Sequence, residues 1–128
     1  MERSGIASMR MQAIRGATTV NRNSAEEILE ATQELLVEIT KRNELLTENL
    51  ISVIFTMTND LDAAFPARAA RNIGWTQVPL LCCSEIPVPG SLPRCIRVLI
   101  HCLSGTDSVP ARHVYLRDAV GLRSDLTN

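Results

Sequence analysis

Aromatic side chains are scarce in this sequence, whose 128 residues contain only Phe55, Phe65, Trp75 and Tyr115. Four aromatic rings are too few for the stacking platform on which single-stranded nucleic acids bind. Neither sign of charge dominates, because 13 basic residues stand against 14 acidic ones. A balanced charge creates no overall field that would attract nucleic acid or an anionic membrane surface. We therefore expect no nucleic-acid partner and no membrane partner.

Long apolar runs are also absent. No segment approaches the roughly 18–20 apolar residues that a membrane-spanning helix requires. The first eight residues lack the apolar core of a secretory signal, so we interpret residues 1–8 as a loose extension before a single domain of residues 9–128. The four cysteines (Cys82, Cys83, Cys95 and Cys102) form neither a metal-binding pair nor a disulfide framework. Reduced thiols in a cytoplasmic protein are the expectation.

Recognisable catalytic and cofactor motifs are missing as well. The glycines are isolated and form no phosphate-binding loop. No serine lies in a nucleophile elbow, and neither His101 nor His113 has an Asp or Cys at a suggestive spacing. Metal ligands at motif spacing are not found. The sequence therefore predicts no metal and no cofactor.

The pattern of apolar residues predicts an α+β domain. Alternating or continuous apolar runs predict strands over residues 11–20, 50–58, 78–86, 94–103 and 113–120, with 50–58 buried on both faces. Ser24 and Glu27 form a capping box that begins a helix over residues 24–42, and Pro66 begins a short helix that ends before Gly74. This order indicates a single mixed five-stranded sheet with helices on one face. We expect the other face to be covered by association with further copies.

Two arginines interrupt strands that are otherwise apolar. Arg15 follows Ala13-Ile14, and Arg97 lies between Ile96 and Val98. A guanidinium buried in a strand requires an anionic partner. That partner could be a carboxylate such as Glu85 in a buried ion pair, or an anionic ligand, and the sequence pattern favours neither. A chain this short has little material for a private cavity, which favours a ligand site between subunits.

Five sequence blocks carry a resemblance to a known family. They are IRGATTV (14–20), AFPARAAR (64–71), VPLLCCSE (78–85), RCIRV (94–98), and RHVYL (112–116) followed by Leu122-Arg123. In this order and spacing the chain resembles monofunctional chorismate mutases of the small trimeric, pseudo-α/β-barrel type. The resemblance implies conversion of chorismate to prephenate by an intramolecular Claisen rearrangement, in a homotrimer, without a cofactor. The missing acid, base and nucleophile agree with it, because no proton moves in that step.

The resemblance also implies roles for individual residues. Arg97 matches an arginine that faces the ether oxygen and one carboxylate, and Glu85 matches a glutamate that accepts a hydrogen bond from the ring hydroxyl. Arg15 and Tyr115 match groups that bind substrate carboxylates. Further substrate-binding positions are implied at Cys82 near the ring hydroxyl, Phe65 from the neighbouring subunit with Ala67, Leu80 and Leu81 nearby, and Arg71 and Arg123 at the rim. Arg68 stands where relatives often have lysine, so the resemblance assigns it no role.

One detail of the implied site conflicts with simple strand geometry. Strict alternation places Cys82 and Glu85 on opposite faces of the strand 78–86. One of the two must therefore lie at a bulge or beyond the end of the strand.

Two other functions remain open at this point. The trimeric enamine/imine deaminases share the architecture and also place an arginine in a cleft between subunits, so the fold alone does not exclude them. A non-catalytic trimer that binds small dicarboxylates is the other alternative.

Overall fold

The computed structural model describes residues 9–105 and 110–122. Its elements follow the chain as β1 (Met9–Thr19), α2 (Ala25–Asn43), β2 (Leu50–Met57), α3 (Ala67–Asn72), β3 (Leu80–Ser84), β4 (Cys95–Gly105) and β5 (Val114–Tyr115), with short 3-10 helices η1 (Thr47–Asn49) and η2 (Arg117–Gly121). This alternation of strands and helices confirms the predicted α+β class.

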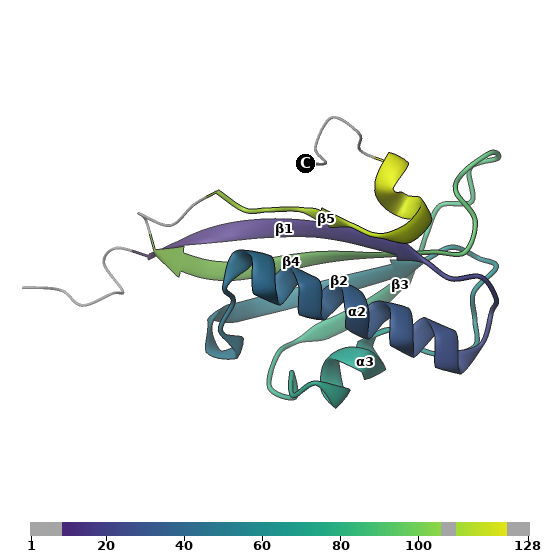
Figure 1. Ribbon diagram of the computed structural model, residues 1–128. Helices are drawn as coiled ribbons and strands as arrows, with labels where there is room; N and C mark the ends of the chain where they lie inside the picture. Colours follow the sequence, from purple (N-terminus) through teal and green to yellow (C-terminus); the bar gives the residue numbers. More distant parts are fainter. Residues whose placement is uncertain (1–8, 106–109, 123–128) are drawn as a thin grey trace, which may run out of the picture.

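The five strands form one mixed sheet in the order β3-β2-β4-β1-β5 (Figure 1). Strand β4 lies at the centre and is antiparallel to both β1 and β2. The outer strands are parallel to their neighbours, β3 to β2 and β5 to β1. The predicted single mixed five-stranded sheet is confirmed.

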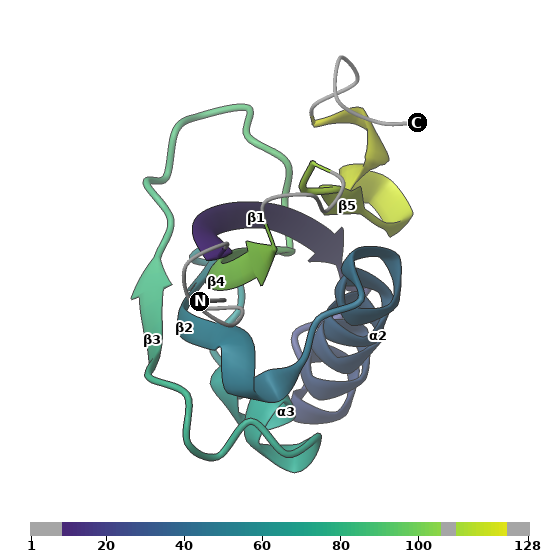
Figure 2. The ribbon, with the colours of Figure 1, turned by 90° about the vertical axis from the view of Figure 1, so that its left-hand side faces the viewer.

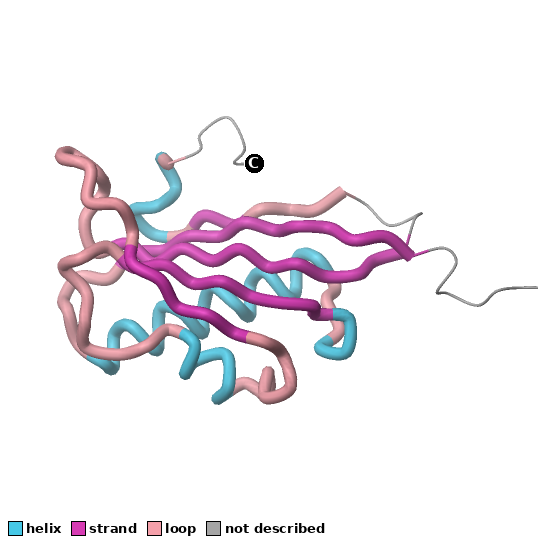
Figure 3. The backbone as a smooth tube through the Cα atoms, turned by 180° about the vertical axis from the view of Figure 1, so that it is seen from behind, coloured by secondary structure: helices cyan, strands magenta, loops and turns pink. Residues whose placement is uncertain are grey.

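Both α-helices pack on the same face of this sheet. The end-on view in Figure 2 shows α2 and α3 on one side of the strands, and the view from behind in Figure 3 shows the strands with the helices beyond them. Within residues 9–105 and 110–122, no helix covers the opposite face. We call that surface the open face of the sheet.

The core fills the space between the helices and the sheet. Strand side chains including Ile14, Phe55 and Ile100 are fully buried, and they meet Leu35 and Ile39 of α2. Each such side chain contributes roughly 1.5–3 kcal/mol by leaving water. Gly16 lets α2 approach β1 closely, because a Cβ at that position would lie only 2.7 Å from Ile39 Cδ1.

Local signals in the sequence explain where the helices begin and end. The Ser24 side chain accepts a hydrogen bond from the Glu27 N–H, as the capping box predicts. Lys41 and Arg42 lie in the last turn of α2, where the helix dipole favours positive charge. Gly74 follows α3 with a φ of 102°, a left-handed conformation that glycine adopts without strain.

Two sequence predictions about the strands are wrong. Residues 113–120 form only the two-residue β5, because the chain turns at Arg117, whose φ is 54°, and continues as η2. The Asp118 N–H donates to Thr19 Oγ1 and holds this turn against the end of β1. Strand β2 lies in the interior of the sheet, but only one of its faces is buried within the single chain. Ile54 and Thr56, on the open face, are only half-buried.

The ends of the remaining elements differ from the predictions by at most two residues. Strand β3 is shorter than residues 78–86, and β4 extends two residues beyond 103. Pro66 caps α3 rather than beginning it.

The described helices include none that is both long and apolar enough to cross a membrane.

Candidate active site

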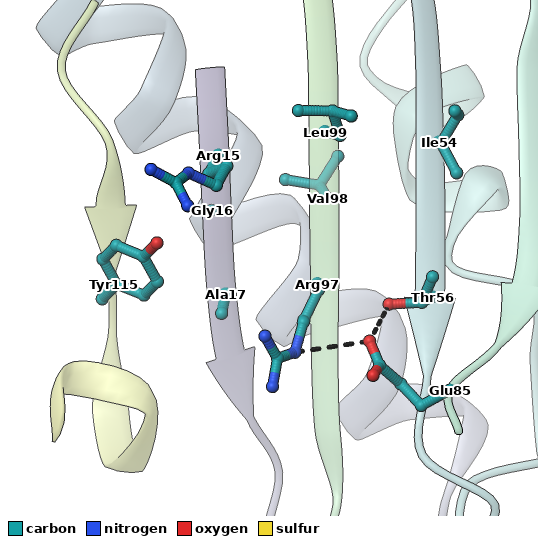
Figure 4. A pocket seen from close by; sticks show the side chains of 10 residues that line it. All are labelled: Arg15, Gly16, Ala17, Ile54, Thr56, Glu85, Arg97, Val98, Leu99 and Tyr115. Atoms are coloured by element: carbon teal, nitrogen blue, oxygen red, sulfur yellow. Dashed lines mark hydrogen bonds and ion pairs between the residues drawn. The ribbon is translucent and has the colours of Figure 1, made fainter. Parts of the chain in front are cut away.

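A pocket of about 290 Å³ lies on the open face, across the middle strands of the sheet. Its charged side chains and its one aromatic ring come from four places in the chain: Arg15 on β1, Arg97 on β4, Tyr115 on β5, and Glu85 just beyond β3 (Figure 4). Apolar residues and one hydroxyl form the rest of the lining, namely Gly16, Ala17, Ile54, Thr56, Val98 and Leu99. The structure thus brings together the four residues on which the sequence analysis relied most.

Arg97 and Glu85 form an ion pair in this pocket. Arg97 Nε lies 3.3 Å from Glu85 Oε2, and the two side chains are 46% and 21% exposed. Arg97 thus pairs with Glu85 as one alternative expected, but the pair is not buried in the single chain, and an anionic ligand is compatible with it. An exposed pair adds about 0–1 kcal/mol of stability. Its main consequence is geometric, because it engages Nε of Arg97 and leaves the two terminal nitrogens of the guanidinium available.

Strand β5 brings Tyr115 to the edge of the same pocket. Ala17 pairs with Tyr115 in parallel register, and the Leu116 N–H donates to the Ala17 carbonyl at 2.9 Å. Two residues earlier along the same pair of segments, the Arg15 N–H donates to Nδ1 of His113 at 2.9 Å. Figure 4 shows the Tyr115 hydroxyl and the Arg15 guanidinium on the same side of the pocket. Two residues far apart in sequence are thereby held side by side.

The charges in the pocket suit an anionic ligand. Two guanidiniums, from Arg15 and Arg97, are opposed by the single carboxylate of Glu85. Each guanidinium can bind a carboxylate with two parallel hydrogen bonds. The lining residues that the structure describes include no histidine, cysteine or serine. The pocket therefore offers two cationic groups that could bind and orient a dianion.

Two other implied binding residues line a second hollow of the same chain. Phe65 and Cys82 contribute to a space of about 310 Å³ next to the end of β2. Phe65 is 70% exposed, which is unusual for the side chain of a phenylalanine. Neither residue lines the arginine pocket of its own chain.

The remaining implied residues line neither hollow or lie outside the described chain. Arg71 on α3 is exposed and acts electrostatically on Cys82. Leu80 packs against the core, whereas Leu81 is 59% exposed and pairs with Ile54. Arg123 lies outside the described residues.

Burial controls the chemistry of the Cys82 thiol. Burial raises the pKa of Cys82, and the positive charge of Arg71 only partly opposes that rise. The thiol therefore stays protonated at neutral pH, as a weak donor rather than a nucleophile. All four cysteines are free.

The structure resolves the conflict between Cys82 and Glu85. Strand β3 ends at Ser84, so Glu85 is the residue that lies beyond the strand. Its N–H still donates to the Met57 carbonyl at 2.9 Å, which fixes where its side chain leaves the backbone. Sequence reasoning missed Thr56, which lines the pocket and donates a hydrogen bond to Glu85 Oε2. Its position opposite Arg97 could have been found only by pairing the two strands in register.

Comparison with known proteins identifies the family. The model of the family described as chorismate mutase type I matches residues 11–126. The chain belongs to the type I chorismate mutase family. The expected resemblance is confirmed over almost the whole sequence, and the match continues through the residues that form both hollows.

Individual chorismate mutases support the same assignment. The chain is 53% identical over 117 residues to chorismate mutase AroH of Thermus thermophilus, covering 91% of this chain and 96% of the relative. It is 42% identical over 120 residues to chorismate mutase AroH of Bacillus subtilis, covering 93% and 94%. A solved structure of chorismate mutase from Clostridium thermocellum superposes with a TM-score of 0.77 at 54% identity, covering 84% of this chain and 96% of that one.

These matches decide between the two enzyme classes considered above. The family model and the relatives named here are all chorismate mutases, and none of them favours an enamine/imine deaminase. Among the described residues, no cluster of three or more His, Cys, Asp or Glu side chains could hold a metal ion.

Proposed function

We propose that this chain is a chorismate mutase whose reaction takes place in the pocket of Arg15, Glu85, Arg97 and Tyr115. Family membership supports the activity, and the pairing of Arg97 with Glu85 at 3.3 Å is the observation that supports the location. As an isomerase of this kind, the enzyme supplies prephenate for aromatic amino-acid biosynthesis.

The chemistry of the rearrangement matches what the pocket contains. In chorismate the ether C–O bond breaks while a new C–C bond forms, and the enolpyruvyl group moves across the ring. Electrons are redistributed within one molecule, so no acid, base, nucleophile or redox partner takes part. Rate enhancement must come from holding the compact reactive conformer and from stabilising charge in the transition state. A pocket whose arginines supply charged donors suits both demands.

Arg97 is the group that we assign to the transition state. As the C–O bond breaks, negative charge develops on the ether oxygen. The guanidinium of Arg97 offers donors to that oxygen, and its Nε is already engaged by Glu85. A donor fixed in place before the reaction needs no reorganisation when the charge appears.

The other side chains bind groups that are the same in substrate and transition state. Arg15 and Tyr115 lie on one side of the pocket and would bind carboxylates of the dianion. Glu85 would accept a hydrogen bond from the ring hydroxyl. Arg123 and Arg71, as cationic side chains, are assigned to the rim of the cleft.

We further propose that three copies assemble so that each cleft uses two chains. The arginine pocket of one chain would receive Phe65 and Cys82, with Leu80, Leu81 and Arg71 nearby, from its neighbour. The exposed Phe65 supports this arrangement, and so does the open face with the exposed apolar side chains of Met11, Leu81 and Leu103. Burying these side chains between subunits would remove them from water. Three sheets that meet in this way give the pseudo-α/β barrel.

The proposed place of action is the cytoplasm. Four free cysteines support it, because thiols persist in reducing compartments and are oxidised in most others.

Incubation of the purified protein with chorismate tests the function directly. We expect chorismate to disappear and prephenate to form in equal amounts without added metal or cofactor. The Arg97→Ala variant is the matched control, because its exposed side chain can be removed without disturbing the core. If the wild-type protein binds chorismate without converting it, the chain is the non-catalytic binding module instead.

A further inference from the structure

Thr56 occupies a defined position between the two charged residues of the pocket. It lies on β2 directly opposite Arg97 on β4, and its half-buried side chain points to the open face. Its hydroxyl donates a hydrogen bond to Oε2 of Glu85. Arg97 Nε contacts that same oxygen. One carboxylate oxygen therefore joins two neighbouring strands through two side chains (Figure 4).

Without such a contact, Glu85 would be weakly constrained. It lies beyond the end of β3, and its backbone is tied to β2 through the Met57 carbonyl. Its side chain has three rotatable bonds, and its partner Arg97 is itself 46% exposed. Two flexible exposed side chains do not fix each other's position well. A threonine on a strand is different, because branching at Cβ restricts the side chain to few rotamers.

We propose that Thr56 is a positioning residue of this site, which sets the Glu85 carboxylate and, through it, the Arg97 guanidinium. The proposal rests on the proposed chorismate mutase function. Both hydrogen-bonding contacts given above engage Oε2, which leaves Oε1 of Glu85 for the hydroxyl of a substrate. Because Nε of Arg97 is held by Glu85, its terminal nitrogens are directed into the pocket. Thr56 thus acts on the reaction without touching the breaking bond.

Three variants at one position test this role. Thr56→Val keeps the shape and the strand preference but removes the hydroxyl, and Thr56→Ser keeps the hydroxyl on a smaller side chain. We expect Thr56→Val to lower kcat about tenfold with little change in KM, since a hydrogen bond to a charged group is lost. Thr56→Ser should stay within about threefold of wild type. Thr56→Ala should resemble Thr56→Val, which excludes an effect of the valine methyl group.

A matched control lies on the same strand and the same face. Ser52 contacts His101 Nδ1 at 3.3 Å and does not line the pocket. Ser52→Ala should leave kcat unchanged. If only Thr56→Val lowers kcat, the loss is due to the Thr56 hydroxyl and not to the removal of a hydroxyl from β2 in general.

A double-mutant cycle separates positioning from a general structural effect. In a Glu85→Ala background the hydroxyl has no carboxylate to hold, so adding Thr56→Val should cost less than about twofold. The proposal is overturned if Thr56→Val retains wild-type kcat, if Thr56→Ser is as impaired as Thr56→Val, or if Thr56→Val costs the same factor without Glu85.

A crystal structure of Thr56→Val makes the test independent of turnover. The Glu85 carboxylate should leave its position beside Arg97, and an unmoved carboxylate would contradict the proposal. If the wild-type protein fails to convert chorismate, the proposed function fails, while this displacement still decides the role of Thr56.

Discussion

The geometry around position 97 suits an arginine and does not suit a lysine. Its Nε is committed to Glu85 at 3.3 Å, and its remaining donors project from a planar group into the pocket. Lysine would carry the same charge but could not engage a protein carboxylate and the substrate in one rigid plane.

We therefore expect Arg97 variants to lose kcat rather than affinity. Arg97→Ala should lower kcat by about 10²–10³-fold, because the charge that it stabilises exists only in the transition state. Tyr115→Phe should mainly raise KM, since the carboxylates are charged throughout the reaction. Steady-state kinetics with chorismate distinguishes the two patterns. An Arg97→Ala enzyme with raised KM and unchanged kcat would show that the assigned role is wrong.

The protonated thiol of Cys82 leads to an expectation about pH. Burial raises its pKa, so the thiol stays neutral up to and beyond the ordinary range near 8.5. Arginine also stays charged, and no proton moves in the chemical step. We expect kcat to be nearly constant from about pH 6 to about pH 9, and Cys82→Ser to leave that profile flat.

Deviations from the flat profile would identify a different participant. A limb near pH 8.5 that Cys82→Ser abolishes would make the thiol part of the reaction. A sharp acidic limb within this range would show that a proton transfer controls the chemical step and would contradict the proposed rearrangement.

Part of the pocket could be predicted from residue types, and part could not. Arginines at positions 15 and 97 stand out in apolar strands, and the structure places both in one pocket. Thr56 carries no such signal, since a threonine is ordinary in a strand. Its role depends on which residue faces it across the sheet, and local sequence does not encode strand register.

At the scale of the elements, the contact between β1 and α2 depends on Gly16. A methyl group there would approach Ile39 Cδ1 at 2.7 Å and Val98 Cγ1 at 3.1 Å, in a fully packed core. Gly16→Ala should therefore lower the free energy of unfolding by about 1–3 kcal/mol, measured by denaturant titration. Gly121→Ala is the matched control, because no atom of the described residues lies within 4 Å of its added carbon, and it should be close to neutral. Equal stabilities for the two variants would show that α2 can move away from β1.

The elements that sequence predicted well are those with a strong local signal. The capping box at Ser24 and the helical spacing of apolar residues defined α2 to within one residue. The segment after His113 has apolar residues that suit a strand, yet only Val114–Tyr115 pair. Contacts with distant groups, such as the Thr19 hydroxyl and Glu34, hold Arg117 and Asp118 in the turn instead. Such tertiary contacts are invisible in a local pattern.

At the scale of the molecule, the two hollows of one chain are complementary in chemistry. One contains the arginines and Glu85, and the other contains Phe65 and Cys82. An assembly of three chains would combine the two hollows at every interface. Light scattering should therefore give a molar mass three times the 14.1 kDa of one chain. A fully active monomer would contradict the shared cleft.

Mixing of two inactive variants tests the shared cleft more sharply. Arg97→Ala destroys one half of a cleft, and Phe65→Asp destroys the other half. When the two chains are unfolded and reassembled together in equal amounts, about a quarter of the clefts should combine two intact halves and recover activity. Mixing without exchange of subunits is the control. Activity that stays at the level of the separate variants would place the whole site within one chain.

The pairing of β5 with β1 has a consequence for protein synthesis. These strands lie side by side in the sheet, and 98 positions separate Arg15 from His113, which binds its N–H. A ribosome releases Arg15 early and Tyr115 late, while α2 and strands β2 to β4 emerge between them. Closing such a long loop is slow relative to local folding. This edge of the pocket therefore forms only after β5 has been made and has paired with β1, long after β1 itself has left the ribosome.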